Sequence, residues 1–330
     1  MNPVSRHPTR RPLIAAALSA LALAGLSAPA TAQPQSTPIK ILVGFPAGGT
    51  IDVVTRQIAE HMRETLGTQV VVENPTGAGG QIAALALKRA APDGRTLMVA
   101  PDHTAVILPE TLNNPGFDIS KDFAPIGMVA NYAGALAVSH ASGVTDMNAW
   151  VAKAKASGTP VSVGVAAPGS KPVFALHAMS KHHNAVFNAV PYRGSVPLVQ
   201  DLNGGHLDAG ITALGDFLEY HKAGRLKVLA ITGEQRASAL PDVPTAKELG
   251  HPINLNFWIA MFAPAGTPDA QVQQLNQALN RALADTKVKE RMTQLVFDPA
   301  PGAPAVVSSR IAAERQYWAP LIKASGWVKQ

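Results

Sequence analysis

The chain contains no cysteine among its 330 residues. Disulfides, thiolate metal sites and cysteine nucleophiles are therefore excluded. Lipid attachment after a signal peptide is excluded as well, because it requires a cysteine at the cleavage site. We therefore expect no stable membrane anchor of that kind.

Three other features are missing. Beyond the N-terminal segment there is no run of about 18 apolar residues, the length that would cross a membrane. The lysines and arginines are scattered rather than gathered into a basic stripe, which argues against a nucleic acid partner. His177, His182 and His183 do not have zinc-site spacing, and no acidic ligand lies near them. We expect a soluble mature chain with no metal and no cofactor.

The first 32 residues have the pattern of a signal peptide. Three arginines precede an Ala/Leu-rich run over residues 13–26, and Ala30-Thr31-Ala32 supplies small residues for cleavage near Ala32-Gln33. This pattern predicts export to the periplasm. The pair Arg10-Arg11 also allows a twin-arginine signal, so the export route stays open. Loss of the leader lowers the formal net charge from +6 to +3, a mild excess that suits an anionic ligand.

The mature sequence alternates short apolar runs with amphipathic segments, which is typical of βαβ units and a largely parallel sheet. Its length suggests two domains. We expect strands at residues 39–44, 69–73, 96–100, 136–138, 160–165, 186–190, 209–212, 228–231 and 256–262. We expect helices at residues 51–66, 81–90, 146–156, 173–181, 196–202, up to 223, 268–283, 288–295 and 305–325. The C-terminal tail is predicted to be helical without further strands, with a kink or break at Pro320.

A glycine-containing turn leads from a strand into a helix N-terminus four times, at residues 44–49, 77–80, 168–170 and 192–194. Helix first turns carry unsatisfied N–H groups and the positive end of the helix dipole. Glycine also lets a ligand approach this backbone closely. Several such turns facing one cleft would hold a carboxylate without a lysine. The alternative is that these glycines only permit tight turns.

Nucleotide-binding motifs fit these turns poorly. Gly164 and Gly169 have the spacing of a P-loop, but Ser170-Lys171 has the reverse of the required order. Residues 77–82 resemble half of a dinucleotide fingerprint, but Ile82 replaces the last glycine. A nucleotide site is therefore not expected.

Individual side chains near the turns have two interpretations each. Asp52 either compensates the helix dipole or faces the ligand. Ser170 either donates its hydroxyl to an anion or caps a helix, and its surroundings do not form a nucleophile elbow. Tyr192 and Arg193 could close over a ligand, although neighbouring strand-end side chains point in opposite directions. Trp258 is expected in the core.

Several motifs resemble the Bug family, the receptors of tripartite tricarboxylate transporters. The likeness covers nearly all of the mature chain in the family's order. The motifs are Val43-Gly44-Phe45-Pro46-Ala47-Gly48-Gly49 with Asp52 and Arg56, Val71-Val72-Glu73-Asn74 with Gly77-Ala78-Gly79-Gly80, Ala91-Pro92-Asp93-Gly94, Lys121-Asp122-Phe123-Ala124-Pro125, Val190-Pro191-Tyr192-Arg193-Gly194, Leu240-Pro241-Asp242-Val243-Pro244-Thr245 and Phe262-Ala263-Pro264-Ala265-Gly266-Thr267-Pro268.

The resemblance implies an α/β type II periplasmic-binding-protein fold, with two lobes that close on a ligand in the cleft between them. We expect residues 33–132 with 256–330 in lobe 1 and residues 133–255 in lobe 2. The implied function is capture of a small organic carboxylate and its delivery to a two-component membrane permease, without catalysis; we expect a monomer. An exported hydrolase-like enzyme and an effector-sensing domain of the same fold are the alternatives.

The family's ligand-binding positions can be transferred to this sequence. Together with the candidates above, they give Phe45, Pro46, Ala47, Gly48, Gly49, Asp52, Gly77, Gly79, Gly80, Gly169, Ser170, Tyr192, Arg193 and Thr212 as the ligand-binding set. The chain departs from the family pattern at Pro75-Thr76, at 165–167, at Val173 and at Thr212. Most of these departures fall in the expected lobe 2. They leave the far end of the ligand open, so that a less polar, aromatic or longer carboxylate is allowed.

Overall fold

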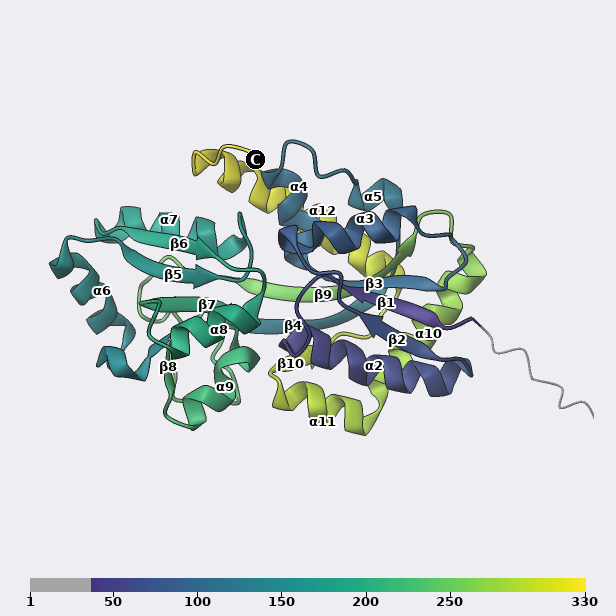
Figure 1. Ribbon diagram of the computed structural model, residues 1–330, viewed down its shortest axis with the longest axis horizontal. Helices are drawn as coiled ribbons and strands as arrows, with labels where there is room; N and C mark the ends of the chain where they lie inside the picture. Colours follow the sequence, from purple (N-terminus) through teal and green to yellow (C-terminus); the bar gives the residue numbers. More distant parts are fainter. Residues whose placement is uncertain (1–36) are drawn as a thin grey trace, which may run out of the picture. The chain divides into compact units, whose positions relative to one another are not determined.

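The computed structural model describes residues 37–330 (Figure 1). The predicted signal peptide lies outside the described residues. The strands are β1 (Ile39–Val43), β2 (Val70–Glu73), β3 (Thr96–Pro101), β4 (Phe123–Ser139), β5 (Val161–Val165), β6 (Phe187–Pro191), β7 (Ala209–Ala213), β8 (Leu226–Ile231), β9 (Asn256–Pro264) and β10 (Phe297–Pro299). The longer helices are α2 (Thr50–Leu66), α3 (Gln81–Arg89), α6 (Met147–Ser157), α7 (Lys171–His183), α8 (Ser195–Asn203), α9 (Leu214–Lys222), α10 (Asp269–Ala284), α11 (Thr286–Gln294) and α12 (Pro304–Ala324). Short helical turns are η1 (Ala78–Gly80), the π-helical η2 (His103–Ile107), α4 (Leu108–Thr111), α5 (Ile119–Asp122) and η3 (His140–Ser142).

The sheet is mixed, and the expectation of a largely parallel sheet holds only within two sets of three strands. β1 pairs in parallel with β2 and β3, and β5 pairs in parallel with β6 and β7. β9 is antiparallel to β3 and β4, and β4 is also antiparallel to β7, β8 and β10. We call β1, β2, β3, β9 and β10 the β1 group, and β5, β6, β7 and β8 the β5 group.

Strand β4 connects the two groups. Its residues Phe123 to Ala133 pair with β9, and Gly134 to Ser139 pair with β7 or β8. The sequence predicted only residues 136–138 as strand here. The pairing with β9 shifts register at Pro125/Gly127 and again at Met128/Ala130. Because of these irregularities, the 17 residues of β4 do not alternate regularly between apolar and polar side chains. The sequence pattern therefore did not predict the full length of the strand.

The helices cover both faces of the strands (Figure 1). On one face, α3, α7 and α12 contribute to a single hydrophobic core that includes residues of both groups. On the other face the core is divided, because α2, α10 and α11 pack with the β1 group and α8 and α9 pack in a separate cluster with β4 and β8. A continuous core on one face and a divided core on the other leave room for a site between the groups.

Helix α2 shows how the sequence produces these faces. Val54, Ile58 and Met62 recur every four residues, and all three are fully buried. The helix ends where Gly67 adopts φ 61, a left-handed conformation that glycine tolerates. The predicted helix over residues 51–66 is confirmed.

The C-terminal region differs from the prediction in two ways. It contains a strand, β10, which pairs with β4 and buries Phe297 completely. Helix α12 also continues through Pro320 without the break that was one of the two expected outcomes. The proline removes a hydrogen bond to the carbonyl of Gln316, which lies on the exposed side of the helix, while Trp318 and Ile322 on the other side remain buried. Solvent can hydrogen-bond the free carbonyl of Gln316, and the packing of Trp318 and Ile322 holds the helix in place. The helix is therefore not broken.

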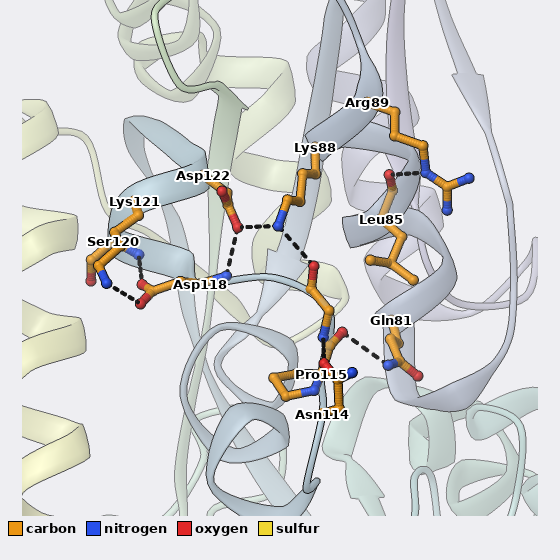
Figure 2. A network of polar contacts seen from close by, with 11 residues as sticks. Gln81, Leu85, Lys88, Arg89, Asn114, Pro115, Asp118, Ser120, Lys121 and Asp122 are labelled. Atoms are coloured by element: carbon orange, nitrogen blue, oxygen red, sulfur yellow. Dashed lines mark hydrogen bonds and ion pairs between the residues drawn. The ribbon is translucent and has the colours of Figure 1, made fainter.

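A network of polar contacts attaches the segment before β4 to α3 (Figure 2). Lys88 Nζ lies 2.9 Å from Asp122 Oδ2 and donates to the Gly116 carbonyl at 2.9 Å. Asp122 Oδ2 also accepts from the Asp118 N–H at 2.7 Å, and Gln81 Nε2 donates to the Pro115 carbonyl at 2.9 Å. The network fixes a loop and lies apart from the cavity described next.

Candidate functional site

A small cavity lies where parallel strands of both groups end. Its walls come from residues that follow or close β1, β3, β5 and β7, together with Tyr132 of β4 and Phe257 of β9. The cavity volume is about 80 Å³. In α/β proteins, ligands bind outside the carboxyl ends of such strands. The lining residues are Phe45, Pro46, Gly49, Thr50, Ile51, Asp52, Pro101, Asp102, His103, Tyr132, Ala166, Ala167, Ser170, Pro172, Ser195, Ile211, Thr212, Ala213, Asp216 and Phe257.

Four helices begin at the wall of this cavity. The wall includes the first residues of α2, the N-cap Ser170 of α7, Ser195 at the start of α8, and Asp216 in the first turn of α9. Each helix start presents N–H groups that have no partner within the helix, and each carries the positive end of the helix dipole. The arrangement therefore favours negative charge in or beside the cavity.

Asp52 stabilises the first glycine-containing turn. Its Oδ2 accepts from the Gly48 N–H at 3.0 Å and from Arg56 Nε at 3.0 Å, and its Oδ1 accepts from Asn74 Nδ2 at 3.0 Å. Asn74 also donates to the Phe45 carbonyl at 3.0 Å. Burial raises the pKa of Asp52, but the hydrogen bonds from Arg56, Gly48 and Asn74 outweigh it, so the pKa is lowered overall. Asp52 thus lines the cavity as an ionised group that is already paired.

Asp216 joins α9 to the start of α2. Its Oδ1 accepts from the Thr50 N–H at 3.1 Å and from Thr50 Oγ1 at 2.9 Å, and its Oδ2 accepts from Thr212 Oγ1 at 3.0 Å. Burial raises the pKa of Asp216 above its ordinary value, although the hydrogen bonds from Thr50, Ser195 and Thr212 oppose the change. The Asp216 carboxylate therefore accepts a hydrogen bond from one of the N–H groups at the start of α2, as a ligand carboxylate could.

A buried ion-pair cluster lies behind the cavity. Lys171 Nζ contacts Asp102 Oδ2, lies 2.7 Å from Glu314 Oε2 and donates to the Asn256 carbonyl at 3.0 Å. Glu314 Oε1 also accepts from Trp258 Nε1 at 2.7 Å. Trp258 is fully buried, which confirms that it is a core residue. Burial raises the pKa of Asp102, the charge of Lys171 lowers it and that of Glu314 raises it, for a net pKa of about 6.

His103 is the buried imidazole of the wall. It is 8% exposed, and neither of its ring nitrogens has a hydrogen-bond partner. Burial and the nearby charge of Lys171 lower its pKa to about 4, so the ring is neutral at pH 7. Buried polar atoms of folded proteins are usually paired, so two unpaired ring nitrogens beside a cavity point to a bound partner.

The structure brings six of the predicted ligand-binding residues to this cavity. They are Phe45, Pro46, Gly49, Asp52, Ser170 and Thr212. Ser170 is the N-cap residue of α7, but its hydroxyl donates to the Ala167 carbonyl at 2.8 Å and accepts no hydrogen bond from a helix N–H.

The other predicted residues lie elsewhere. Ala47 and Gly48 are exposed residues of the first turn, and Arg193 is exposed as well. Tyr192 donates its hydroxyl to Asp201 Oδ2 at 2.6 Å. A side chain at Gly169 would meet Trp327 at 3.1 Å, which shows that this glycine packs against the C-terminal segment.

The second glycine-containing turn, with Gly77, Gly79 and Gly80, is one layer removed from the cavity. Gly79 has φ 64, and a Cβ there would lie 2.6 Å from Nε2 of His103. A Cβ on Gly44 would lie 2.7 Å from the Gly80 Cα, so the two turns touch each other. The glycines allow this close approach. His103 lies between the cavity and Gly79, so it separates the second turn from the cavity.

Several lining residues were absent from the sequence-based set. Asp102 and His103 directly follow a predicted strand, so the strand-end rule could have identified them. Asp216 occupies the first turn of α9, as Asp52 does in α2. The sequence did not define where α9 begins, because no glycine-containing turn precedes it. Thr50 and Ser195 follow predicted turns by one residue.

No group of three or more metal-ligating side chains occurs among residues 37–330. Within the same range, no helix is long and apolar enough to span a membrane. His183 Nε2 lies 2.9 Å from His251 Nδ1, so one of the three histidines between residues 177 and 183 is paired with a fourth histidine.

This architecture, with helix starts meeting at strand ends from two groups, is that of periplasmic binding proteins, and sequence comparison identifies the family. Residues 54–327 match the family model TctC, described as the tripartite tricarboxylate transporter family receptor. The chain belongs to this family, as its resemblance to Bug proteins predicted.

Similar proteins support this assignment along the whole chain. Protein BugT of Bordetella pertussis is 32% identical over 309 residues, which cover 93% of this chain and 95% of BugT. The periplasmic binding protein BugD superimposes with a TM-score of 0.83 at 31% identity, covering 89% of this chain and 99% of BugD. MatC from Rhodopseudomonas palustris, solved with bound malate, gives a TM-score of 0.81 at 28% identity, over 86% of this chain and 98% of MatC. The type II periplasmic-binding-protein fold is confirmed.

Proposed function

We propose that this chain is a periplasmic receptor that binds a small organic carboxylate in the cavity and delivers it to the permease of a tripartite tricarboxylate transporter. The observation that carries the proposal is the meeting of four helix N-termini at one small cavity. Such starts stabilise a carboxylate by N–H hydrogen bonds and by the helix dipole. Malate bound to the related MatC supports a carboxylate as ligand.

Ligand capture would proceed by closure of two lobes. The proposed lobes are residues 33–132 with 256–330 and residues 133–255. The change of β4 from pairing with β9 to pairing with β7 and β8, between Ala133 and Gly134, supports this boundary. The hydrogen bonds from Thr50 to Asp216 then join the lobes beside the ligand. A ligand that touches both lobes shifts the open–closed equilibrium toward the closed form.

Two features favour binding without turnover. Ser170, which lines the cavity, donates its hydroxyl proton to the Ala167 carbonyl rather than to a base that could activate it as a nucleophile. The similar protein BugD is a periplasmic binding protein, and MatC is solved with bound malate. We propose that the chain acts in the periplasm, after removal of the predicted signal peptide, as a monomer without a cofactor.

Calorimetric titration of the purified protein with mono-, di- and tricarboxylates tests the proposal, and we expect saturable binding by at least one class. The variant Ser170→Asp places a carboxylate at the N-cap of α7, where aspartate is well tolerated. It should lower carboxylate affinity at least about tenfold, because the new charge repels the ligand and competes for the helix start.

Ala303→Asp is the matched control. It adds the same charge at an exposed N-cap, that of α12, which does not line the cavity. Affinity should not change in this variant. Failure of every carboxylate to bind the unmodified protein, or equal affinity losses in the two variants, would contradict the proposed function.

A further inference from the structure

Direct contacts between the two proposed lobes surround the cavity. Asp216 of lobe 2 accepts hydrogen bonds from the N–H and the hydroxyl of Thr50 in lobe 1, at 3.1 and 2.9 Å. Gly194 of lobe 2 lies so close to Pro46 of lobe 1 that a Cβ on the glycine would overlap the proline ring. Thr50, Pro46 and Asp216 all line the cavity. The lobes, as proposed, are therefore closed on each other in this structure.

Gly215, in the first turn of α9, packs tightly against lobe 1 as well. A Cβ at this position would overlap the carbonyl oxygen of Leu295, which follows α11, and would lie 2.9 Å from Thr50 Cγ2. The φ of Gly215 is not positive, so its backbone conformation would accept any residue. It is the neighbouring lobe that leaves no room for a side chain. A backbone carbonyl, unlike the end of a flexible side chain, cannot turn away from an added Cβ.

The packing of Gly215 and the hydrogen bonds of Asp216 depend on each other. The two residues are adjacent in the chain, and both meet lobe 1 at Thr50. The start of α9 must reach Leu295 before the Asp216 carboxylate can reach the Thr50 N–H and hydroxyl. Hydrogen bonds to a buried carboxylate are among the stronger ones. A conformation in which the lobes stay farther apart loses them, and its free energy is higher for that reason.

Full closure leaves little space for a ligand. The cavity volume is about 80 Å³, whereas ligand pockets usually measure about 300–1,000 Å³. A short ligand can be enclosed with the contacts at Gly215 and Asp216 formed or nearly formed. Each added methylene group of a longer ligand holds the walls, and with them the lobes, farther apart. A long ligand therefore binds without the stabilisation that these contacts give to the closed form.

We propose that Gly215 is a positioning residue for ligand capture: its packing on Leu295 sets how far the lobes close, and full closure selects short carboxylates over longer ones of the same charge. The inference rests on the proposed function and on the proposed lobes, and it specifies the length of the ligand. Gly215 does not line the cavity, so it acts on the ligand only through the closure of the lobes.

A series of ligands with constant charge tests the length preference by calorimetry at neutral pH with the purified protein. Malonate, succinate, glutarate and adipate form one series, and the monocarboxylates from propanoate to hexanoate form the other. We expect the best short ligand of at least one series to bind at least about tenfold more tightly than the six-carbon member of that series. Single methylene groups are worth factors of this size when a site has no room for them.

The variant Gly215→Ala assigns the preference to the contact between the lobes. The added methyl group prevents full closure, so the affinity for the best short ligand should fall at least about tenfold. The affinity for the six-carbon ligand should change by less than about twofold, because its complex does not use the contact. Gly302→Ala is the matched control: a Cβ there would lie 3.7 Å from its nearest neighbour, Val306 Cγ2, and all affinities should stay unchanged.

The distance between the lobes can be measured directly, because the chain contains no cysteine and introduced cysteines can be spin-labelled selectively. Glu64→Cys on α2 and Gln200→Cys on α8 place one label on each proposed lobe, at exposed positions outside the cavity. Electron–electron double resonance should give a shorter distance with the best short ligand than with the six-carbon ligand. Gly215→Ala should lengthen the distance in the complex with the short ligand, and Gly302→Ala should not.

The outcomes separate this inference from the proposed function. If six-carbon ligands bind as tightly as short ones, or if Gly215→Ala weakens short and long ligands equally, selection by closure at Gly215 is overturned and the carboxylate receptor stands. If no carboxylate binds, the proposed function fails and the inference fails with it. Should Gly215→Ala not fold, the label distances in the otherwise unmodified protein decide, and equal distances with short and long ligands overturn the inference.

Discussion

Two lysines of this protein contact the same kinds of group, carboxylates and a backbone carbonyl, but differ greatly in burial. Lys88 Nζ contacts the Asp122 carboxylate and the Gly116 carbonyl on the surface (Figure 2). Lys171 Nζ contacts the carboxylates of Asp102 and Glu314 and the Asn256 carbonyl. The Lys88 side chain is 39% exposed, whereas that of Lys171 is 2% exposed.

The difference in burial decides what each network does. Water competes for Lys88 and screens its charge, so its ion pair with Asp122 adds little to stability and mainly fixes a loop. Lys171 has lost its hydration, so it depends on the protein for all of its compensation. The same loss of water raises the pKa of Asp102 to about 6 and lowers that of His103 to about 4. Only the buried network therefore affects the chemistry of the cavity.

The largest predicted effect follows from removing the buried cation. Lys171→Met keeps the aliphatic length of the side chain but leaves Asp102 and Glu314 without their cation. We expect the free energy of unfolding to fall by about 3–5 kcal/mol, the usual cost of breaking a buried ion pair by removing one partner. Urea unfolding at neutral pH measures the change.

Lys181→Met is the control, since Lys181 belongs to the same helix, α7, and is exposed. Its effect should stay within about 0.5 kcal/mol. A loss below about 1 kcal/mol for Lys171→Met would show that the buried and exposed networks are energetically alike, and the comparison would fail.

The second predicted effect is a pH dependence of stability that arises from His103. Its pKa is about 4 in the folded state and 6.5 ordinarily, so between these values the unfolded chain binds more protons. Stability therefore falls as the pH falls through this window. Asp102 acts in the opposite direction, because its pKa of about 6 lies above the ordinary 3.8 and the folded state takes up its proton first.

The variant His103→Phe separates these two contributions. Between pH 6.5 and about pH 4.5, the free energy of unfolding of the unmodified protein should fall by about 2 kcal/mol more than that of the variant. Other histidines, such as His183, titrate in both proteins and cancel in the difference. Parallel stability curves for the two proteins across this range would mean that His103 is protonated as readily in the folded state as in the unfolded chain.

Much of the fold could be predicted from the sequence because its signals are local. The four-residue spacing of Val54, Ile58 and Met62 predicted α2. The turns before α2, α7 and α8 were found from glycine, and the starts of these helices do meet at the cavity. Phe45, Pro46 and Gly49 belong to the site for that reason.

The polar wall of the cavity could not be predicted in the same way. Asp216 pairs with Thr50, which is 166 positions earlier, and Lys171 pairs with Glu314, which is 143 positions later. Which acid meets which donor depends on how the strands are ordered, and the antiparallel pairings of β4 and β9 were not visible in the pattern of apolar residues. The contact between His103 and Gly79 of the second glycine turn was likewise not predictable, since the two residues belong to different segments of the chain.

The smallest predicted effect returns to the exposed lysine. Lys88→Met removes the ion pair with Asp122 and the hydrogen bond to Gly116, but water can solvate both partners in its place. Asp122 also keeps the hydrogen bond from the Asp118 N–H, which holds its pKa below the ordinary value together with Lys88. We expect a loss of at most about 1 kcal/mol in urea unfolding, decreasing as salt is added, and unchanged affinity for the preferred carboxylate. A loss as large as that of Lys171→Met would show that the loop between α4 and α5, rather than the buried charge, limits the stability of this protein.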